Sequence, residues 1–216
     1  MSTFNKETIA CPKCGKEIDV IVWKSVNADQ DPEAKSQLLD GTLFSFKCGH
    51  CGYKGNLDHE MLYHDMQRKV FVSYIPDMSV EKKVQMLTEI RTMLGISMDG
   101  YKIRFVADRN QIREKALIFD LGWDDRVIEV CKIIMIAQAQ NAYPGIEISA
   151  MYFDANEGQY SFAIFGSKPL TAVFSAEAYL SMNAELAQWL AKESGDDVVI
   201  DHDWAMALLQ KINNRQ

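Results

Sequence analysis

Two pairs of cysteines carry the clearest chemistry in the sequence. Cys11 and Cys14 lie in ACPKCGKE, Cys48 and Cys51 lie in FKCGHCGYKG, and 33 residues separate the two pairs. A C-x2-C turn presents two sulfur atoms on one side of the chain, and a second such turn completes a tetrahedron around a metal ion. A glycine follows each second cysteine and suits a turn with a positive φ angle. The spacing therefore predicts one structural Zn²⁺ ion per chain, held by these four cysteines.

A redox role is the main alternative for the same cysteines. Cys11-Pro12-Lys13-Cys14 has the pattern of dithiol enzymes, in which a helix N-terminus lowers the pKa of the attacking thiol. Here the β-branched run IDVIVW follows the pair, and it predicts a strand instead of a helix. An iron site and unliganded cysteines are further alternatives. Because two matched pairs are present, a four-cysteine zinc site explains the pattern best.

The histidines near these pairs do not indicate a second metal site. His50 lies between Cys48 and Cys51, at a position that we expect to face solvent. His59 and His64 belong to HEMLYH, which is close to the H-E-x-x-H sequence of metalloproteases. Their spacing is five residues instead of four, which places them about 140° apart on a helix. A closed four-cysteine site also leaves no open coordination position, so catalysis at the metal is disfavoured.

Four lysines flank the two cysteine turns: Lys13, Lys16, Lys47 and Lys54. Four thiolates and one divalent cation carry a charge of −2, and nearby lysines would screen it. The same lysines are also a candidate contact surface for nucleic acid. We favour screening, because it explains the lysines without a partner.

The elements expected around the cysteines are those of a zinc ribbon. The runs IDVIVW and TLFSF are rich in β-branched and aromatic residues, and they predict strands that leave the two turns and pair. Between them, residues 31–39 predict a helix with Asp31 as its N-cap, Pro32 at its first position and Gly41 as its stop. The two ends of the chain look loosely structured.

The remainder of the chain predicts helices and an antiparallel meander. Residues 145–175 contain three strand patterns separated by Asn156–Gly158 and Gly166–Pro169, with helical patterns before and after them. Cys131 lies in an apolar helical pattern and is expected to be a buried small hydrophobe. We therefore predict an α+β protein with a zinc-ribbon domain at residues 1–78 and an α+β domain at residues 79–216.

Aromatic residues are concentrated on the predicted meander: Tyr152, Phe153, Tyr160, Phe162, Phe165 and Phe174. They are candidates for a ligand-binding or base-stacking platform. A packed sheet face explains them with fewer assumptions, because alternate residues of a meander normally meet the helices.

The charge and hydropathy of the chain limit the classes of binding partner and the cellular compartment that we expect. The formal charge is −7, with 9 Lys/Arg against 11 Asp/Glu up to residue 78 and 14 against 19 after it. Neither half has the basic surface that drives non-specific nucleic-acid binding or docking to a membrane. No stretch has the pattern of a signal peptide or a membrane span. We expect a cytoplasmic protein, in which the five cysteines are thiols or metal ligands.

The cysteine turns and several further segments resemble the CpXC family, bacterial proteins named for a Cys-Pro-x-Cys turn followed by a second paired-cysteine turn. The similarity includes Cys11-Pro12-Lys13-Cys14-Gly15, NADQDPEAKSQLLDGTLFSFKC, LYHD at residues 62–65 and IRFVADRNQIREKALIFDLGWDDRVIEV. It covers most of the chain. In the second turn Gly49 takes the usual place of proline, which makes that turn less rigid. The resemblance implies the paired-cysteine module and names no activity.

Three classes of function follow from the sequence. The first is a structural zinc ribbon that supports an α+β domain, which binds or regulates a protein partner. The second is a nucleic-acid-associated factor that uses the lysines and aromatic residues of the ribbon. The third is an enzyme with its site in the second domain. The sequence leans against an enzyme, because it contains no phosphate-binding loop, nucleophile elbow or dinucleotide fingerprint.

Overall fold

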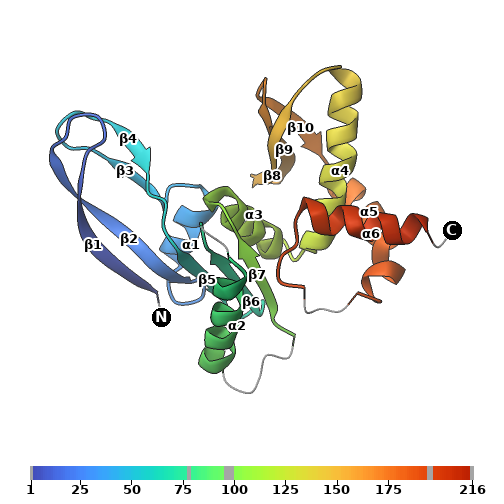
Figure 1. Ribbon diagram of the computed structural model, residues 1–216, viewed down its shortest axis with the longest axis horizontal. Coiled ribbons are helices and arrows are strands. Elements are labelled where there is room, and N and C mark those ends of the chain that lie inside the picture. The colour runs from blue at the N-terminus through green and yellow to red at the C-terminus, as the bar shows by residue number, and fades with distance from the viewer. Residues whose placement is uncertain (1, 77–78, 95–99, 194–196, 215–216) are drawn as a thin grey trace. The chain divides into compact units, whose positions relative to one another are not determined.

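The computed structural model describes residues 2–76, 79–94, 100–193 and 197–214 (Figure 1). The chain divides into two compact units, Met1–Ala116 and Leu117–Gln216. Both units contain helices and strands, so the expected mixed α+β class is confirmed. Within the described ranges, no helix combines the length and apolar character that a membrane span needs.

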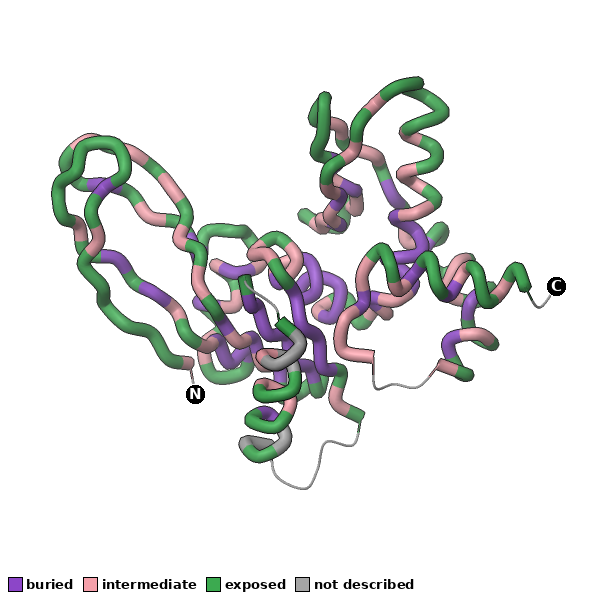
Figure 2. Tube along the Cα trace, in the orientation of Figure 1, coloured by how far each residue is buried: buried purple, intermediate pink, exposed green. Residues whose placement is uncertain are grey.

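A five-stranded mixed sheet forms the centre of the N-terminal unit, in the order β1-β2-β5-β6-β7. Its strands are β1 (Thr3–Ala10), β2 (Glu17–Asn27), β5 (Met61–Asp65), β6 (Val70–Tyr74) and β7 (Lys102–Val106). Neighbours are antiparallel at β1–β2 and β5–β6, and parallel at β2–β5 and β6–β7. Every residue of β6 is buried, and Figure 2 shows the buried residues gathered around β5 to β7. The hydrophobic core of this unit therefore lies at that end of the sheet.

Three helices accompany this sheet: α1 (Pro32–Leu39), α2 (Val80–Leu94) and α3 (Arg109–Asp120). The predicted helix after Asp31 is confirmed. The Asp31 side chain accepts a hydrogen bond from the Ala34 N–H, and Pro32 occupies the first turn. Gly41 follows the helix with a φ of +82°, a conformation that glycine adopts without a steric cost.

The strands at the cysteine turns pair differently from the expectation. The run IDVIVW lies in β2, which pairs with β1. The end of TLFSF lies in β3 (Ser45–Lys47), which pairs with β4 (Lys54–Asn56) in a separate two-stranded sheet. The prediction that the two runs pair with each other is therefore wrong. Each cysteine turn instead connects two strands that are adjacent in the sequence and pair with each other. Closing such a short loop costs less conformational entropy than pairing two distant strands.

Strand β1 also corrects the expectation of a loose N-terminus. Seven of its eight residues are exposed. The strand therefore lacks the alternation of buried apolar residues by which a sequence indicates a strand. Its position depends instead on eight register partners in β2, from Thr3 to Ala10. The resulting β1–β2 hairpin extends away from the rest of the N-terminal unit (Figure 1).

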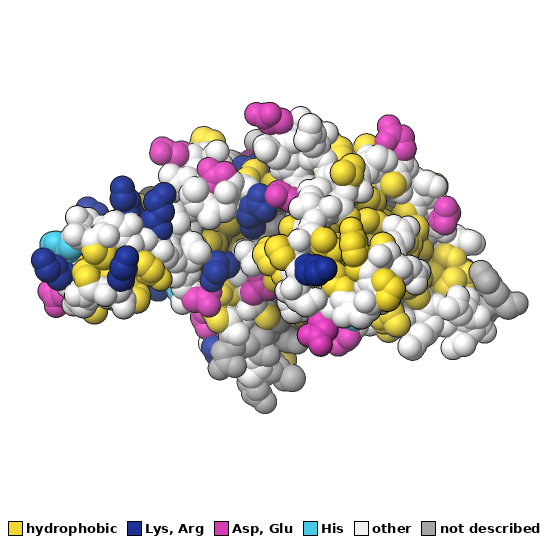
Figure 3. Space-filling model, turned by 90° about the horizontal axis from the view of Figure 1, so that it is seen from above, with side chains coloured by type: hydrophobic (Ala, Val, Ile, Leu, Met, Phe, Trp, Pro, Cys, Tyr) yellow, Lys and Arg dark blue, Asp and Glu magenta, His cyan; other side chains and the backbone are white. Residues whose placement is uncertain are grey.

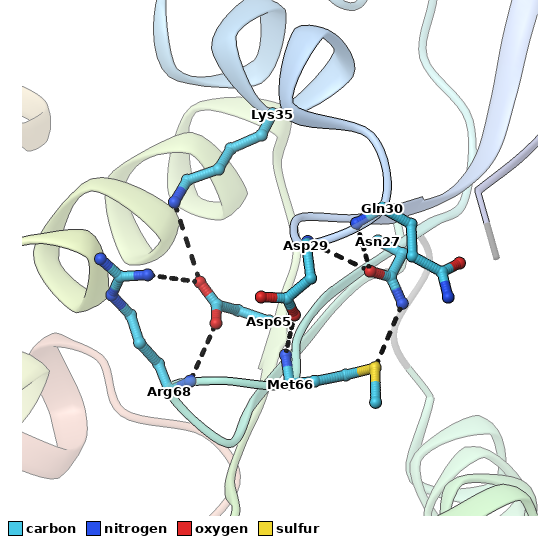
Figure 4. A network of polar contacts seen from close by, with 7 residues as sticks. All are labelled: Asn27, Asp29, Gln30, Lys35, Asp65, Met66 and Arg68. Carbon is cyan, nitrogen blue, oxygen red and sulfur yellow. Dashed lines mark hydrogen bonds and ion pairs between the residues drawn. The ribbon is translucent and has the colours of Figure 1, made fainter.

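A buried carboxylate helps to hold α1 and the β5–β6 turn together (Figure 4). The Asp65 side chain is 2% exposed, and its Oδ2 atom lies 3.1 Å from Arg68 Nη1 and 3.8 Å from Lys35 Nζ. Nearby, the Met66 N–H donates to Asp29 Oδ2 at 2.7 Å. These contacts connect the segment after β2 to the segment after β5, and thereby support the base of the β1–β2 hairpin.

The N-terminal unit continues beyond residue 78, where the sequence placed a domain boundary. Strand β7 pairs in parallel with β6, from Val70 with Lys102 to Tyr74 with Val106. The chain thus returns to the first sheet after α2, and the compact unit extends to Ala116. Residues 77 and 78, at the expected boundary, lie outside the described residues.

The C-terminal unit contains the predicted meander. It comprises α4 (Asp125–Ala142), β8 (Ile148–Asn156), β9 (Gln159–Gly166), β10 (Leu170–Phe174), α5 (Ala176–Leu190) and α6 (His202–Asn213). The strands pair antiparallel in the order β10-β9-β8, which confirms the prediction. Cys131 on α4 is 4% exposed, as expected, and its burial raises its pKa to about 12.

The aromatic residues of the meander divide between its two faces. Phe153, Phe162 and Phe174 are buried in the core formed with the helices, as expected. Tyr152 and Phe165 contact each other on the opposite face, where Phe165 is 48% exposed. The expectation of a packed face is therefore correct for the inner residues and wrong for these two. Strand alternation sends neighbouring positions to opposite faces, and one face of this sheet remains open.

Candidate metal centre

Two six-residue loops hold the cysteines, and their backbones follow the same hydrogen-bond pattern. In the first loop, between β1 and β2, the Cys11 N–H donates to the Lys16 carbonyl and the Gly15 N–H donates to the Cys11 carbonyl, both at 2.9 Å. In the second loop, between β3 and β4, the Cys48 N–H donates to the Tyr53 carbonyl at 2.8 Å and the Gly52 N–H donates to the Cys48 carbonyl at 2.9 Å. The two loops are thus equivalent knuckles.

The glycines of both knuckles adopt the positive φ angle that the sequence indicated. Gly15 has a φ of 71° and Gly52 has a φ of 72°. This left-handed conformation is costly for residues that carry a Cβ atom. The glycines therefore allow each chain to turn beneath its pair of sulfur atoms.

The knuckles bring the four predicted cysteines into one cluster. Their sulfur atoms all lie within 4.8 Å of one another. Between the two knuckles, Cys11 Sγ lies 3.8 Å from Cys51 Sγ and Cys14 Sγ lies 3.8 Å from Cys48 Sγ. A tetrahedral ion with bonds of about 2.3 Å places its sulfur ligands about 3.8 Å apart, whereas a disulfide bond measures about 2.05 Å. The cluster therefore fits a four-coordinate metal ion.

The cluster is buried on one side and open on the other. Cys11 and Cys48 are 2% and 0% exposed, Cys51 is partly exposed and Cys14 is exposed. Burial opposes ionisation of Cys48, but the backbone N–H groups of Cys51 and His50, with the neighbouring thiols, outweigh it and lower the Cys48 pKa to about 6. The lowered pKa favours the thiolate form of Cys48, which is the form that binds a metal ion.

The remaining thiols would have to lose protons when a metal binds. The Tyr53 N–H favours the Cys51 thiolate, but burial and the neighbouring sulfur atoms outweigh this contact and raise the Cys51 pKa to about 11. Negative charge on several close sulfur atoms is unfavourable until a cation compensates it. Metal binding at this cluster would therefore release protons, and its affinity would fall as the pH falls.

An aromatic contact supports the second knuckle from its own hairpin. Phe46 on β3 lies directly opposite Gly55 on β4, and the centroids of the Phe46 and Tyr53 rings are 6.1 Å apart. A Cβ atom at Gly55 would lie 2.9 Å from the Phe46 ring and 3.0 Å from the Tyr53 ring. Gly55 therefore leaves the space that lets these rings pack over β4. Sequence reasoning missed this residue, because a single glycine in a short strand gives no metal-binding signal.

The side chains of the histidines discussed above are not members of the group that could hold a metal among the described residues. His50 is exposed, as expected. The HEMLYH segment is extended instead of helical: His59 Nε2 lies 2.8 Å from the Trp23 carbonyl oxygen, and His64 Nε2 lies 3.2 Å from the Tyr101 hydroxyl. Among the described residues, the group able to hold a metal consists of the four cysteines.

The four flanking lysines, Lys13, Lys16, Lys47 and Lys54, are all exposed around the knuckles. Figure 3 shows Lys and Arg side chains gathered over the end of the N-terminal unit that carries the cysteine hairpins. Lys47 and Lys54 are direct register partners across the β3–β4 hairpin. Two positive charges therefore face each other beside the sulfur cluster.

Comparison with known families agrees with the pattern of the two knuckles. The family model described as CpXC protein matches residues 9–132, which are 124 of the 216 residues. The chain belongs to the CpXC family. The CpXC match begins near the end of β1, includes both cysteine turns and strands β2 to β7, and ends within α4. No curated protein and no solved structure matches the chain.

Replacing Gly55 by valine is expected to weaken metal binding. The added side chain would displace the Phe46 and Tyr53 rings and distort the second knuckle. We expect the affinity for Zn²⁺ to fall about 10- to 100-fold, the range typical of lost support around metal ligands. Competition with a chromophoric chelator measures this change.

Gly49→Ala is the matched control for this variant. Gly49 lies in the same knuckle, its φ is outside the left-handed range, and an added Cβ meets no atom within 4 Å. Its zinc affinity should remain close to that of the unchanged protein. Equal affinities for Gly55→Val and Gly49→Ala would contradict the supporting role of Gly55.

Proposed function

We propose that Cys11, Cys14, Cys48 and Cys51 hold one structural Zn²⁺ ion in a zinc ribbon, in a protein of the bacterial cytoplasm. The observation that carries this proposal is the fit of two equivalent knuckles, with cross-hairpin sulfur distances of 3.8 Å, to a tetrahedral ion. Four thiolates in this geometry suit zinc or iron, and zinc is the usual ion of closed structural sites.

The small size of the two hairpins supports a structural role for the ion. Strands β3 and β4 have only three residues each, and an isolated two-stranded hairpin is at best marginally stable in water. Strand β1 buries very little of its surface. An ion that binds both knuckles would compensate for this small core, because metal-binding free energy contributes directly to folding. Four sulfur ligands would also leave no position for a substrate.

A protein-binding role for the C-terminal unit is the second part of the proposal. Val173 on β10 is 86% exposed and Leu180 on α5 is 60% exposed. Val173 also lines an apolar groove of about 350 Å³. Exposed apolar surface of this kind, next to a groove, is typical of contact sites for other molecules. We propose that this unit binds a protein partner and that the zinc ribbon supports it.

An enzymatic role has weaker support in the same unit. A hollow of about 780 Å³ between the meander and the start of α5 is lined by Asp154 and Glu177 among other residues. The Glu177 pKa is lowered by its own backbone N–H and by the Ser175 hydroxyl. Both groups lie at the start of α5, so this shift is explained by helix capping and does not indicate a general acid or base.

Nucleic-acid binding is the second candidate function, and the facing lysines favour it. Within the described part of the chain, no carboxylate lies within ion-pair distance of Lys13, Lys16, Lys47 or Lys54. Like charges directly opposite each other destabilise a hairpin, and Lys47 faces Lys54. The anionic metal–thiolate centre would offset part of this cost, and bound phosphates would also offset it.

The metal proposal predicts about one zinc ion per purified chain. The double variant Cys48→Ser, Cys51→Ser should lose that zinc, because it removes half of the ligands. Cys131→Ala should retain it, since Cys131 lies in the core of the C-terminal unit. Elemental analysis of the three proteins tests this expectation. A stable disulfide between the knuckles in the absence of metal would contradict it.

The second candidate predicts salt-dependent binding of a single-stranded oligonucleotide. Replacing Lys47 and Lys54 by glutamine should reduce the slope of log K against log salt concentration by about 1.4, or about 0.7 for each lost phosphate contact. Lys82→Gln with Lys211→Gln is the control, because these lysines pair with Glu60 and Glu193. Equal slopes for the two double variants, measured by fluorescence anisotropy, would exclude a specific role for the hairpin lysines.

A further inference from the structure

The apolar groove in the C-terminal unit lies between α4, α5 and the end of β10. Its lining includes Cys131, Ile134, Met135 and Gln138 from α4, and Ala178 and Met182 from α5. The α4 residues have the spacing i, i+3, i+4, i+7 and therefore share one helix face. Ile134 on this face is 37% exposed, so the apolar stripe of α4 continues from the core into the groove.

The groove has no formal charge, although a quarter of the chain consists of charged residues. A charged group placed there would lose its hydration without gaining a partner. Methionine side chains adapt to ligands of different shape, and two of them line this groove. Its charge and chemistry therefore match an uncharged, apolar occupant.

Strand β10 gives the groove a free backbone edge. It is the outer strand in the order β10-β9-β8, so alternate residues direct backbone N–H and C=O groups away from β9. Edge strands usually carry charges or proline that prevent further pairing. The β10 sequence LTAVF carries neither. The edge is therefore chemically suited to accept another strand.

We propose that the C-terminal unit binds an extended, uncharged segment of a partner protein, which pairs with β10 and inserts an apolar side chain into the groove. This inference rests on the proposed protein-binding function of the unit and specifies the chemistry of its partner. Backbone hydrogen bonds to β10 would supply affinity, and the groove would select the side chain.

A second copy of the chain is a less suitable occupant than a separate peptide. Pairing β10 with β10 of another copy would offer Leu170, Ala172 and Phe174 on the inner side. Phe174 is 8% exposed and belongs to the core of its own unit, and Leu170 and Ala172 pack against that core. These side chains cannot also fill the groove of the other copy. A partner segment without a fold of its own has side chains free to enter it.

Selection from a displayed library of random dodecapeptides on the full-length protein tests this inference. We expect enriched peptides with apolar residues at alternate positions and no charge at those positions. Ala178→Trp fills the groove from an exposed position and should weaken their binding at least about tenfold. Gln138→Glu introduces a charge into the groove with little change in side-chain size, and it should also weaken peptide binding. Ala184→Trp, at an exposed alanine of the same helix outside the groove lining, should change it less than about twofold.

Hydrogen exchange on the complex with a selected peptide distinguishes strand addition from other modes of binding. The peptide should protect alternate backbone amides of β10 that exchange quickly in the free protein. Protection confined to α4 and α5 would overturn the inference, as would β10 protection that rises with protein concentration without peptide. The inference would also be overturned if the selection gave no peptide whose binding is weakened by Ala178→Trp. If a protein partner then binds wild type and Ala178→Trp equally, only this inference fails and the proposed function stands.

Discussion

The convergence of four sulfur atoms is the constraint on which the N-terminal part of the structure depends. The β1–β2 and β3–β4 hairpins belong to different sheets, and the cysteine distances of 3.8 Å join their turns. Strands β1, β3 and β4 contain no fully buried residue, so they contribute little packing between the hairpins. A cation shared by both turns is the simplest interaction that would hold them in this arrangement.

The same centre accounts for several features of its surroundings. The positive φ angles of Gly15 and Gly52 shape the knuckles, and Gly55 leaves room for the rings beside the second one. The exposed lysines lie where a centre of charge −2 would lower the cost of their mutual repulsion. Screening and phosphate binding use the same side chains, and the salt dependence of binding separates the two roles. The C-terminal unit has a different surface chemistry, with an uncharged groove beside an unprotected edge strand.

Local sequence signals predicted local structure well. Asp31 and Pro32 marked the start of α1, the turns around Gly158 and Pro169 separated the strands of the meander, and the cysteine spacing identified the members of the cluster. Strand pairing and the division into units were not predictable in this way. They depend on contacts between distant segments, such as β6 with β7, which no short pattern reveals. The paired contacts of Asp65 and the free edge of β10 likewise appear only when those segments come together.

X-ray absorption spectroscopy at the zinc edge tests the central claim most directly, because it measures the ligand shell of the bound ion in the intact protein. The account predicts four sulfur neighbours at about 2.3 Å and no nitrogen or oxygen neighbour. A shell that contains nitrogen or oxygen would contradict the closed site formed by Cys11, Cys14, Cys48 and Cys51. It would show that a histidine or solvent completes the coordination, and it would reopen the case for chemistry at the metal.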